Sequence, residues 1–316
     1  MITTNTDKAK QVLENDGIIG FPTETVYGLA GNALSEKAIR SIFQLKNRPL
    51  DNPLIVHVSS LDKIDFITEN MPNKAHQLAD KFWPGPLTLL LKKSDKISDL
   101  VTAGQETVAV RIPNHPIALK LLESLDFPLV APSANPYQSI SPTSAKHVAD
   151  YFENELTLVL DGGFCEKGLE STIVGFEDDD VVIYRLGSIP LEDIEACVGK
   201  VKMNTGRDLK SPGMAKKHYS PKTPLIVTKN IEEVLQRLDN RKRSIVCFDQ
   251  LPNVQEMENT IFYSFHGDLD FAASRLYSLL HELDDQNLDI LIFEEFPNIG
   301  LGKTINDRIK RASELK

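Results

Sequence analysis

Residues 17–28 read Gly17-Ile18-Ile19-Gly20-Phe21-Pro22-Thr23-Glu24-Thr25-Val26-Tyr27-Gly28. The first five form a short apolar run that stops at a proline, a pattern typical of a buried strand. The residues after it begin with Pro22 and are mostly polar, so we expect them on a loop that carries functional residues. Ser35 then caps a predicted helix whose apolar residues, Ile39 to Leu45, fall near helical spacing.

The alternation of strand and helix continues beyond this point. Residues 53–58 predict a strand, and Pro72 opens another helix. Further strands are predicted at residues 87–91, 108–112, 129–131, 156–160, 171–176 and 181–184. The acidic run 177–180 is most simply a solvated hairpin turn. So many interleaved strands and helices predict a twisted α/β domain over residues 1–199.

The rest of the chain divides into a linker and a smaller α/β domain. Residues 200–223 lose the periodicity and are predicted to be a loop, with seven Lys or Arg residues and one acid between Lys200 and Lys222. Residues 224–316 form the second predicted domain. Its strands are expected at 225–228, 244–248, 261–265 and 288–293, and its helices near 231–239, 268–283 and 302–314.

The composition is that of a globular protein. Hydrophobic residues make up 41% of the chain and charged residues 25%, which argues against wholesale disorder. The net charge of -10 argues against a surface devoted to nucleic acid. Cys165, Cys197 and Cys247 are too far apart to predict a zinc site or disulfides. The chain shows no signal pattern and no run of ~18 apolar residues, so we expect a cytoplasmic protein without a membrane contact.

Two polar clusters point to an anionic ligand. Lys46-Asn47-Arg48-Pro49 and Ser133-Ala134-Asn135 interrupt hydrophobic elements of an otherwise acidic chain. A lysine and an arginine two residues apart are well suited to phosphate or carboxylate. By contrast, Gly300-Leu301-Gly302-Lys303-Thr304 ends like a P-loop, but Pro297 stands where that motif requires glycine. We therefore predict only a glycine turn into a helix at that point.

These motifs, taken in order, resemble the threonylcarbamoyl-AMP synthases, the YrdC-like family, in its long two-domain form. The resemblance runs nearly from end to end. The blocks that carry it are Pro22–Leu29, Lys46–Pro49, Asp51–His57, Trp83–Thr88, Arg111–Pro113, Ser133–Asn135, Ser141–Thr143, Gly168–Thr172 and Ser211–Met214. It implies a twisted mixed-sheet YrdC-like domain followed by a smaller Rossmann-like α/β domain.

The resemblance also implies a reaction and its participants. L-threonine, bicarbonate or CO2, and ATP give threonylcarbamoyl-AMP and pyrophosphate, which makes the enzyme a nucleotidyltransferase. Other enzymes then transfer the threonylcarbamoyl group to tRNA, and direct tRNA contact is left open. Mg²⁺ is expected on the ATP phosphates, with no ligands from protein side chains.

The residues implied for ATP begin with Lys46 and Arg48, which supply positive charge and are the catalytic candidates. The remaining ATP candidates by resemblance are Asn52, Thr107, Ser133, Ser141 and Arg185. Asn135 either binds phosphate or fixes its own turn. Tyr219 is hypothesised to contact the nucleotide at the end of a lid formed by residues 200–222.

For threonine, Arg111 at a strand end is the natural clamp for the carboxylate. The resemblance adds Thr25, His57, Ala131 and Ser171 to the same pocket. His57 could also be a purely structural histidine, and nothing in the sequence makes it a general base. Trp83-Pro84-Gly85-Pro86 is interpreted as a rigid turn without chemistry of its own.

Two places depart from the family pattern, namely Tyr137-Gln138 after the Ser-Ala-Asn motif and Ala215-Lys216 in the linker. The sequence disfavours two other functions. An RNA-binding protein without adenylation chemistry is disfavoured by the net charge and by a basic run that lacks aromatic residues until Tyr219. A carbamoyltransferase for metallocentre maturation would carry zinc-binding cysteine pairs, which this chain lacks.

Overall fold

The structure is a computed structural model that describes residues 1–178, 180–204, 219–238, 241–250 and 257–313. The chain divides into two compact units. Among the described residues, the first unit contains 1–137 and 141–204, and the second contains 138–140 and the residues from 219 onward. The three residues 138–140 join the second unit because the Ser220 amide donates to the Gln138 carbonyl (2.9 Å) and Ser139 forms a parallel bridge with Ser220.

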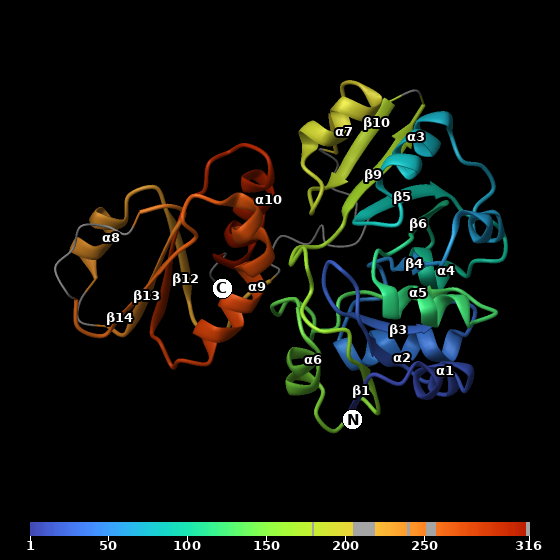
Figure 1. The fold of residues 1–316 in the computed structure, drawn as a ribbon, viewed down its shortest axis with the longest axis horizontal. Coiled ribbons are helices and arrows are strands. Elements are labelled where there is room, and N and C mark those ends of the chain that lie inside the picture. The colour runs from blue at the N-terminus through green and yellow to red at the C-terminus, as the bar shows by residue number, and fades with distance from the viewer. Residues whose placement is uncertain (179, 205–218, 239–240, 251–256, 314–316) are drawn as a thin grey trace. The chain divides into compact units, whose positions relative to one another are not determined.

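The first unit is built on a mixed sheet, seen in the right half of Figure 1. In the described residues its strand order is β1-β8-β2-β3-β7-β4-β6-β5-β9-β10-β11. The strands are β1 (Ile2–Thr3), β2 (Ile19–Phe21), β3 (Gly28–Asn32), β4 (Ile55–His57), β5 (Leu87–Lys92), β6 (Thr107–Arg111), β7 (Leu129–Val130), β8 (Val159–Leu160), β9 (Thr172–Glu177), β10 (Asp180–Arg185) and β11 (Lys202–Met203). Both parallel and antiparallel neighbours occur, as in β4 with β6 and β5 with β6.

Helices cover both faces of this sheet. They are α1 (Thr6–Glu14), α2 (Glu36–Lys46), the 3-10 helix η1 (Leu61–Phe66), α3 (Asn73–Phe82), α4 (Asp99–Thr102), α5 (Pro116–Glu123), α6 (Ala145–Tyr151) and α7 (Leu191–Val198). Local chemistry sets their ends. Ser35 caps α2 by accepting a hydrogen bond from the Ala38 amide, and Asn47 ends it in the left-handed region at φ 51°.

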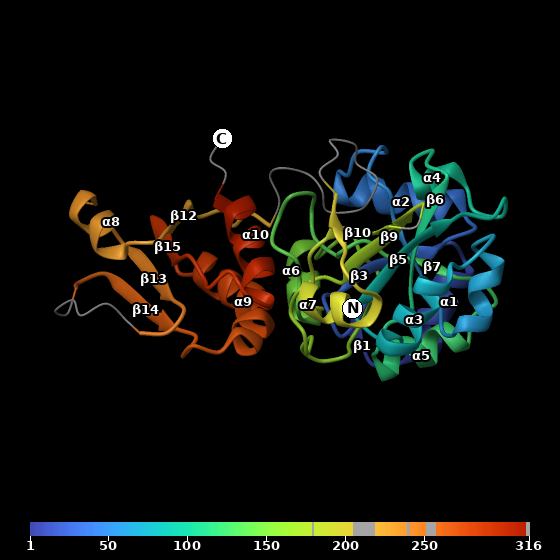
Figure 2. The ribbon, with the colours of Figure 1, turned by 90° about the horizontal axis from the view of Figure 1, so that it is seen from above.

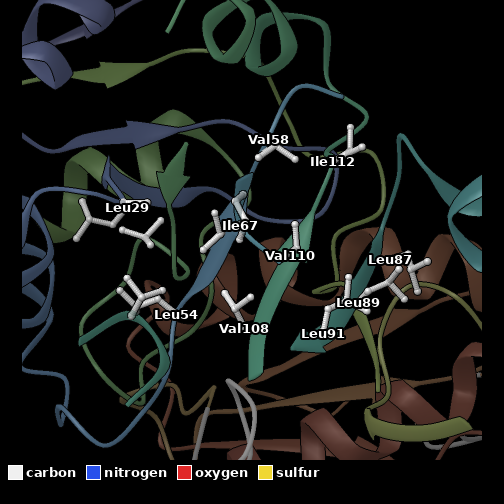
Figure 3. Close-up of a cluster of buried hydrophobic side chains, with 14 of the residues drawn as sticks. Leu29, Leu54, Val58, Ile67, Leu87, Leu89, Leu91, Val108, Val110 and Ile112 are labelled. Atoms are coloured by element: carbon white, nitrogen blue, oxygen red, sulfur yellow. The ribbon is translucent and has the colours of Figure 1, made fainter. Parts of the chain in front are cut away.

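The main core lies on one face of the sheet. Because side chains alternate along a strand, Val108 and Val110 point to the same side, with Leu89 and Leu91 beside them (Figure 3). Val56, which pairs with Val110, belongs to the same cluster. Residues of α2, α3 and α7 complete this cluster. The helices α3 and α7 lie together over β5, β9 and β10 (Figures 1 and 2).

The opposite face carries two separate apolar clusters. One joins α1 and α5 to strands β2, β3, β7 and β8. The other is small and consists of side chains from β4, β5, β6, β9 and β10, namely Ile55, Leu90, Ala109, Ile173, Val182 and Tyr184. His57 lies two residues after Ile55 on β4, and Arg111 lies two residues after Ala109 on β6, so both point to this same face. We call this the polar-ended face.

The second unit is a parallel sheet with helices on both sides. Its strands are β12 (Leu225–Thr228), β13 (Arg243–Cys247), β14 (Thr260–Ser264) and β15 (Ile290–Glu294), in the order β12-β15-β13-β14. Ile231 and Leu235 of α8 (Ile231–Arg237) pack on one face, against Ile245 and Ile292. The helices α9 (Leu269–Asp284) and α10 (Leu301–Ser313) lie on the other (Figures 1 and 2).

The fold class predicted from the sequence, a mixed-sheet α/β domain followed by a Rossmann-like domain, is confirmed. The glycine turn predicted at Gly300 is also present, with φ 48° directly before α10 begins at Leu301. Among the described residues, no helix combines the length and apolar character needed to cross a membrane.

Candidate active site

The register of β4 and β6 arranges the candidate residues along one face. These strands are parallel, with Ile55 opposite Ala109 and His57 opposite Arg111. Continuing the register backwards brings Pro53 beside Thr107 at the other end. Thr107 and Arg111 are four positions apart along β6, which corresponds to about 13 Å of extended strand. The polar-ended face therefore has one group of candidates near Thr107 and another near Arg111, with Ile55 and Ala109 between them.

Arg48 defines the first group. Its Nη2 donates to Asn52 Oδ1 (2.6 Å) and to the Pro53 carbonyl (2.8 Å), and its Nε donates to the Asn52 carbonyl (3.2 Å). The end of α2 at Lys46 places Arg48 at this position. Arg48 and Asn52, both predicted for ATP, are thus in contact, and Thr107 lies close by along the register.

Lys46 joins this group to the Ser-Ala-Asn loop. Its ammonium group is buried and donates to the carbonyls of Ser133 and Asn135. Burial, and then the nearby Arg48 charge, hold the pKa of Lys46 well below its usual range. Asn135 Nδ2 donates to the Pro136 carbonyl at 2.9 Å, a contact that a turn-fixing role predicts. Its contact with phosphate stays a prediction.

The segment 22–28 lies between two loops that carry candidates. The Tyr27 amide donates to the Pro142 carbonyl, and the Tyr27 carbonyl accepts from the Ala134 amide, both at 2.8 Å. Gly28 is required because a Cβ there would stand 2.9 Å from the Cβ of Ala131, another threonine candidate. The Tyr27 hydroxyl is used structurally, since it donates to the Gly163 carbonyl at 2.7 Å. Three motifs that are distant in sequence are therefore joined here.

Arg111 defines the second group. Its Nε donates to the Gly85 carbonyl (3.2 Å) and its Nη1 to Thr25 Oγ1 (2.8 Å). Its Nη2 lies 2.8 Å from Glu24 Oε1, and both side chains are almost fully buried. The turn at 83–86 therefore contributes more than rigidity, because its Gly85 carbonyl orients the guanidinium. Glu24 had no role in the sequence-based prediction, although it stands inside the segment quoted first.

His57 lies beside Arg111 and is buried. Its Nδ1 is 3.2 Å from the Ile55 carbonyl, which can only accept, so Nδ1 carries the hydrogen. Burial, reinforced by the Arg111 charge, lowers the pKa of His57 to about 3. The ring is therefore neutral near pH 7. The structure places it in the second group, and its contact with threonine stays a prediction.

Ser171 and Arg185 form a third contact at the edge of the same face. Arg185 Nη2 donates to Ser171 Oγ (3.0 Å) and to the Ser171 carbonyl (2.9 Å). The Ser171 hydroxyl also shares a hydrogen bond of 2.7 Å with Thr88 Oγ1. Ser141 Oγ donates to Glu170 Oε1 at 2.7 Å, next in the chain to Ser171. Thr88 and Glu170 lie in the blocks that carry the resemblance but had no assigned role.

Tyr219 lies in the second unit rather than with these groups. Its ring stacks on Tyr277 (5.5 Å between centroids), and the Arg308 guanidinium lies 4.9 Å from its centroid. Its contact with the nucleotide stays a prediction. Most of the predicted lid, residues 205–218, lies outside the described residues. Within the part of the chain that the structure describes, no cluster of three or more His, Cys, Asp or Glu side chains could hold a metal ion.

A buried arginine, Arg111, and a buried Lys-Arg pair, Lys46 and Arg48, on an α/β scaffold are the chemistry expected of an enzyme whose substrates carry carboxylate and phosphate groups. Family models agree with this class. Residues 11–187 match the Sua5/YciO/YrdC model described as "Telomere recombination", and residues 189–314 match "Threonylcarbamoyl-AMP synthase, C-terminal domain".

Individual relatives extend over nearly the whole chain. The threonylcarbamoyl-AMP synthase of Pyrococcus abyssi is 37% identical over 94% of this chain and 90% of its own length. That of Bacillus subtilis is 37% identical over 97% and 92%. The crystal structure of P. abyssi Sua5 complexed with L-threonine matches with a TM-score of 0.89 at 34% identity, covering 98% of this chain and 94% of that one. The chain belongs to the threonylcarbamoyl-AMP synthase family and to the nucleotidyltransferase class.

Proposed function

We propose that the protein converts L-threonine, bicarbonate and ATP into threonylcarbamoyl-AMP, pyrophosphate and water. The observation that carries this proposal is the presence of two separately held cations, Arg48 on Asn52 and Pro53 just before β4, and Arg111 on Thr25 and Gly85 at the end of β6. An amino acid joined through a carbamate to a nucleotide phosphate is an elongated ligand with anionic groups at separate points. The relative from P. abyssi that was crystallised with L-threonine supports the amino acid part.

The proposed roles follow from the contacts. Arg111 binds the threonine carboxylate, and Thr25, His57, Ala131 and Ser171 line the same pocket. Arg48, Asn52 and Thr107 bind the triphosphate together with Lys46, Ser133, Asn135, Ser141 and Arg185. The carbamate oxygen attacks the α-phosphate, and pyrophosphate leaves. Residues already held by hydrogen bonds, such as Arg48 on Asn52, lower the barrier because little reorganisation accompanies the reaction.

Mg²⁺ is proposed to enter bound to the ATP phosphates. Hydroxyl, amide and cationic side chains dominate the phosphate-binding group, which suits a metal that keeps several waters and is held mainly by substrate oxygens. Its contribution when bound is to neutralise charge on the leaving pyrophosphate. The protein side chains contribute the complementary positive charge of Arg48 and Lys46.

Residues 200–223 are proposed to act as a lid with Tyr219 at its end, and the product is proposed to serve tRNA-modifying enzymes in the cytoplasm. Replacing residues 211–219 with a neutral flexible sequence tests the lid. A raised KM for ATP or a loss of turnover supports it, whereas unchanged kinetics reject it.

The reaction itself is tested with purified protein, ATP labelled at the α-phosphate, Mg²⁺, bicarbonate and one amino acid at a time. Product formation that needs threonine and bicarbonate together supports the proposal. Arg111→Ala and Lys46→Ala are expected to reduce it by at least a hundredfold, and Lys37→Ala, an exposed change on α2, is expected to leave it unchanged. Folded protein without threonine-dependent turnover contradicts the proposal, and a salt-dependent tRNA gel shift then tests a binding role.

A further inference from the structure

The ion pair between Glu24 and Arg111 is closed off from solvent. The exposed fraction of the Arg111 side chain is 4% and that of Glu24 is 3%. Arg111 Nη2 and Glu24 Oε1 are 2.8 Å apart, but they lack the alignment of a hydrogen bond. Apart from this ion pair, both carboxylate oxygens of Glu24 and the Nη2 group of Arg111 have no hydrogen-bonding partner among the described residues.

Such groups are rare in folded proteins, because each buried polar atom without a partner costs free energy. Here three of them meet at one point, and the other nitrogens of Arg111 are oriented by Gly85 and Thr25. The two side chains are of opposite charge, and both keep hydrogen-bonding capacity that their ion pair does not use. A zwitterion satisfies both at once, with its carboxylate on Arg111 and its ammonium group on Glu24.

We propose that Glu24 binds the α-ammonium group of the substrate and removes its proton, which makes it a catalytic base. This inference rests on the proposed function, in which threonine is the amino acid bound at Arg111. The carboxylate and ammonium groups of threonine are attached to one carbon atom. A carboxylate held by Arg111 therefore brings the ammonium group towards the adjacent Glu24.

The chemistry requires such a base, since an ammonium nitrogen has no lone pair with which to attack carbon. In the first step an N–H bond breaks, the nitrogen keeps the electron pair, and the proton forms an O–H bond on Glu24. The neutral amine then attacks the carbon of bicarbonate. A C–N bond forms, a C–O bond breaks, and the departing hydroxide takes a second amine proton and leaves as water. The product is the carbamate.

The titratable groups around Glu24 do not compete for this role near neutral pH. The nearby Cys165 thiol has its pKa raised by burial and by the Glu24 charge. Across Arg111, His57 has its pKa lowered to about 3. The pH dependence expected for Glu24→Gln therefore does not arise from Cys165 or His57.

The test compares the wild type with Glu24→Gln and Glu24→Asp, with Glu166→Gln as an exposed control. Wild-type turnover comes first, because its absence overturns the proposed function and not the role of Glu24. In Glu24→Gln, kcat/KM for threonine is expected to fall by about a hundredfold or more at pH 7. As the pH is then raised, kcat/KM of Glu24→Gln should recover by about tenfold per pH unit, because a growing fraction of free threonine has a neutral amine. Glu24→Asp should retain part of the activity and the wild-type pH profile.

If Glu24→Gln lowers kcat/KM by the same factor at every pH, so that its pH profile runs parallel to that of the wild type, the base role is overturned. Glu24 then only positions Arg111. Thermal unfolding of each variant identifies a folding defect. If Glu24→Gln does not fold, the wild type still provides a test. The 2-hydroxy analogue of threonine, which lacks the ammonium group, should bind at least tenfold more weakly than threonine. Equal binding of the two would overturn the proposal.

Discussion

Arg185 donates three hydrogen bonds to Ser171, one to its hydroxyl group and two to its carbonyl oxygen. By resemblance Arg185 was assigned to ATP and Ser171 to threonine, yet the two side chains are in direct contact. The Ser171 hydroxyl is also bonded to Thr88. A change at Ser171 is therefore expected to reach both substrates.

Ser171→Ala should raise the KM for ATP as well as that for threonine, each by about 2- to 10-fold. The reason is that one neutral hydrogen bond contributes about 0.5–1.5 kcal/mol, and here the hydroxyl holds Arg185 in place. Initial-rate kinetics with each substrate varied in turn measure both values. Ser274→Ala on α9 is the control. An effect confined to threonine would contradict the coupling.

Arg48→Lys keeps the positive charge but loses the forked contact with Asn52 and Pro53. We expect ATP to bind about 10- to 100-fold more weakly, because a lysine cannot reproduce the planar donor pattern of arginine. Threonine binding, proposed at Arg111 with no contact to Arg48, should change by less than about twofold. Calorimetric titration with each ligand measures this, and Arg40→Lys on the exposed side of α2 is the matched control. Equal losses for both ligands would contradict two separate binding groups.

His57 links stability to pH. Its pKa is about 3 in the folded protein and about 6.5 in the unfolded chain, so only the unfolded chain binds this proton between those values. The free energy of unfolding should therefore fall as the pH is lowered through this window, by about 1.4 kcal/mol per pH unit.

His57→Gln removes that contribution. Between pH 6.5 and 4.5 the wild type should lose about 2–3 kcal/mol more than the variant, measured by denaturant unfolding. His76→Gln, at an exposed site on α3, should behave like the wild type. Parallel pH dependences for the wild type and His57→Gln would mean that His57 is protonated in the folded protein.

The segment at Gly300 should be structural. A Cβ on Gly302 would stand 2.0 Å from the Pro297 carbonyl oxygen, so Gly302→Ala should destabilise the second unit by about 1–3 kcal/mol or more. Lys303→Ala should leave the KM for ATP unchanged, because no P-loop forms. Thermal unfolding measures the effect of Gly302→Ala on stability, and initial-rate kinetics with ATP measure the KM of Lys303→Ala. A large loss of ATP affinity in Lys303→Ala would restore the phosphate-binding interpretation.

Removal of Mg²⁺ with EDTA should abolish threonylcarbamoyl-AMP formation and leave threonine binding intact, because the metal is expected on the ATP phosphates alone. Restoring excess Mg²⁺ is the control. A loss of threonine affinity in EDTA would indicate a metal held by the protein near Arg111.

Strong local patterns made much of this fold predictable. The cap at Ser35, the strand at 225–228 and the hairpin around 177–180 follow from capping, alternation and turn chemistry, and all three are present. Strand β3 escaped prediction because Gly28-Leu29-Ala30-Gly31-Asn32 has little strand propensity. It forms because Gly28 allows close approach to Ala131 and because β2 and β7 pair with it on either side.

The site was predictable in its residue types but not in its pairings. Arg111 and the Lys46-Arg48 cluster stand out in sequence as cations in a hydrophobic context. The partners of Arg111, namely Glu24, Thr25 and Gly85, come from segments far apart in the chain, so local spacing carries no information about them. The pairing of Glu24 with Arg111 exists only in the folded chain, where the loop after β2 meets the end of β6.

The bridge between Ser139 and Ser220 affects the design of truncated and chimeric forms of this protein. Residues 138–140 sit between Asn135 and Ser141, both assigned to ATP, yet they are paired with a strand partner from the second unit. A truncation at residue 199 would remove Ser220, which pairs with Ser139 and donates to the Gln138 carbonyl. A chimera that exchanges the second unit inherits the same requirement. Residues 138–140 of the second unit thus lie within the sequence of the first, and a graft of the second unit has to include a match for Gln138 and Ser139.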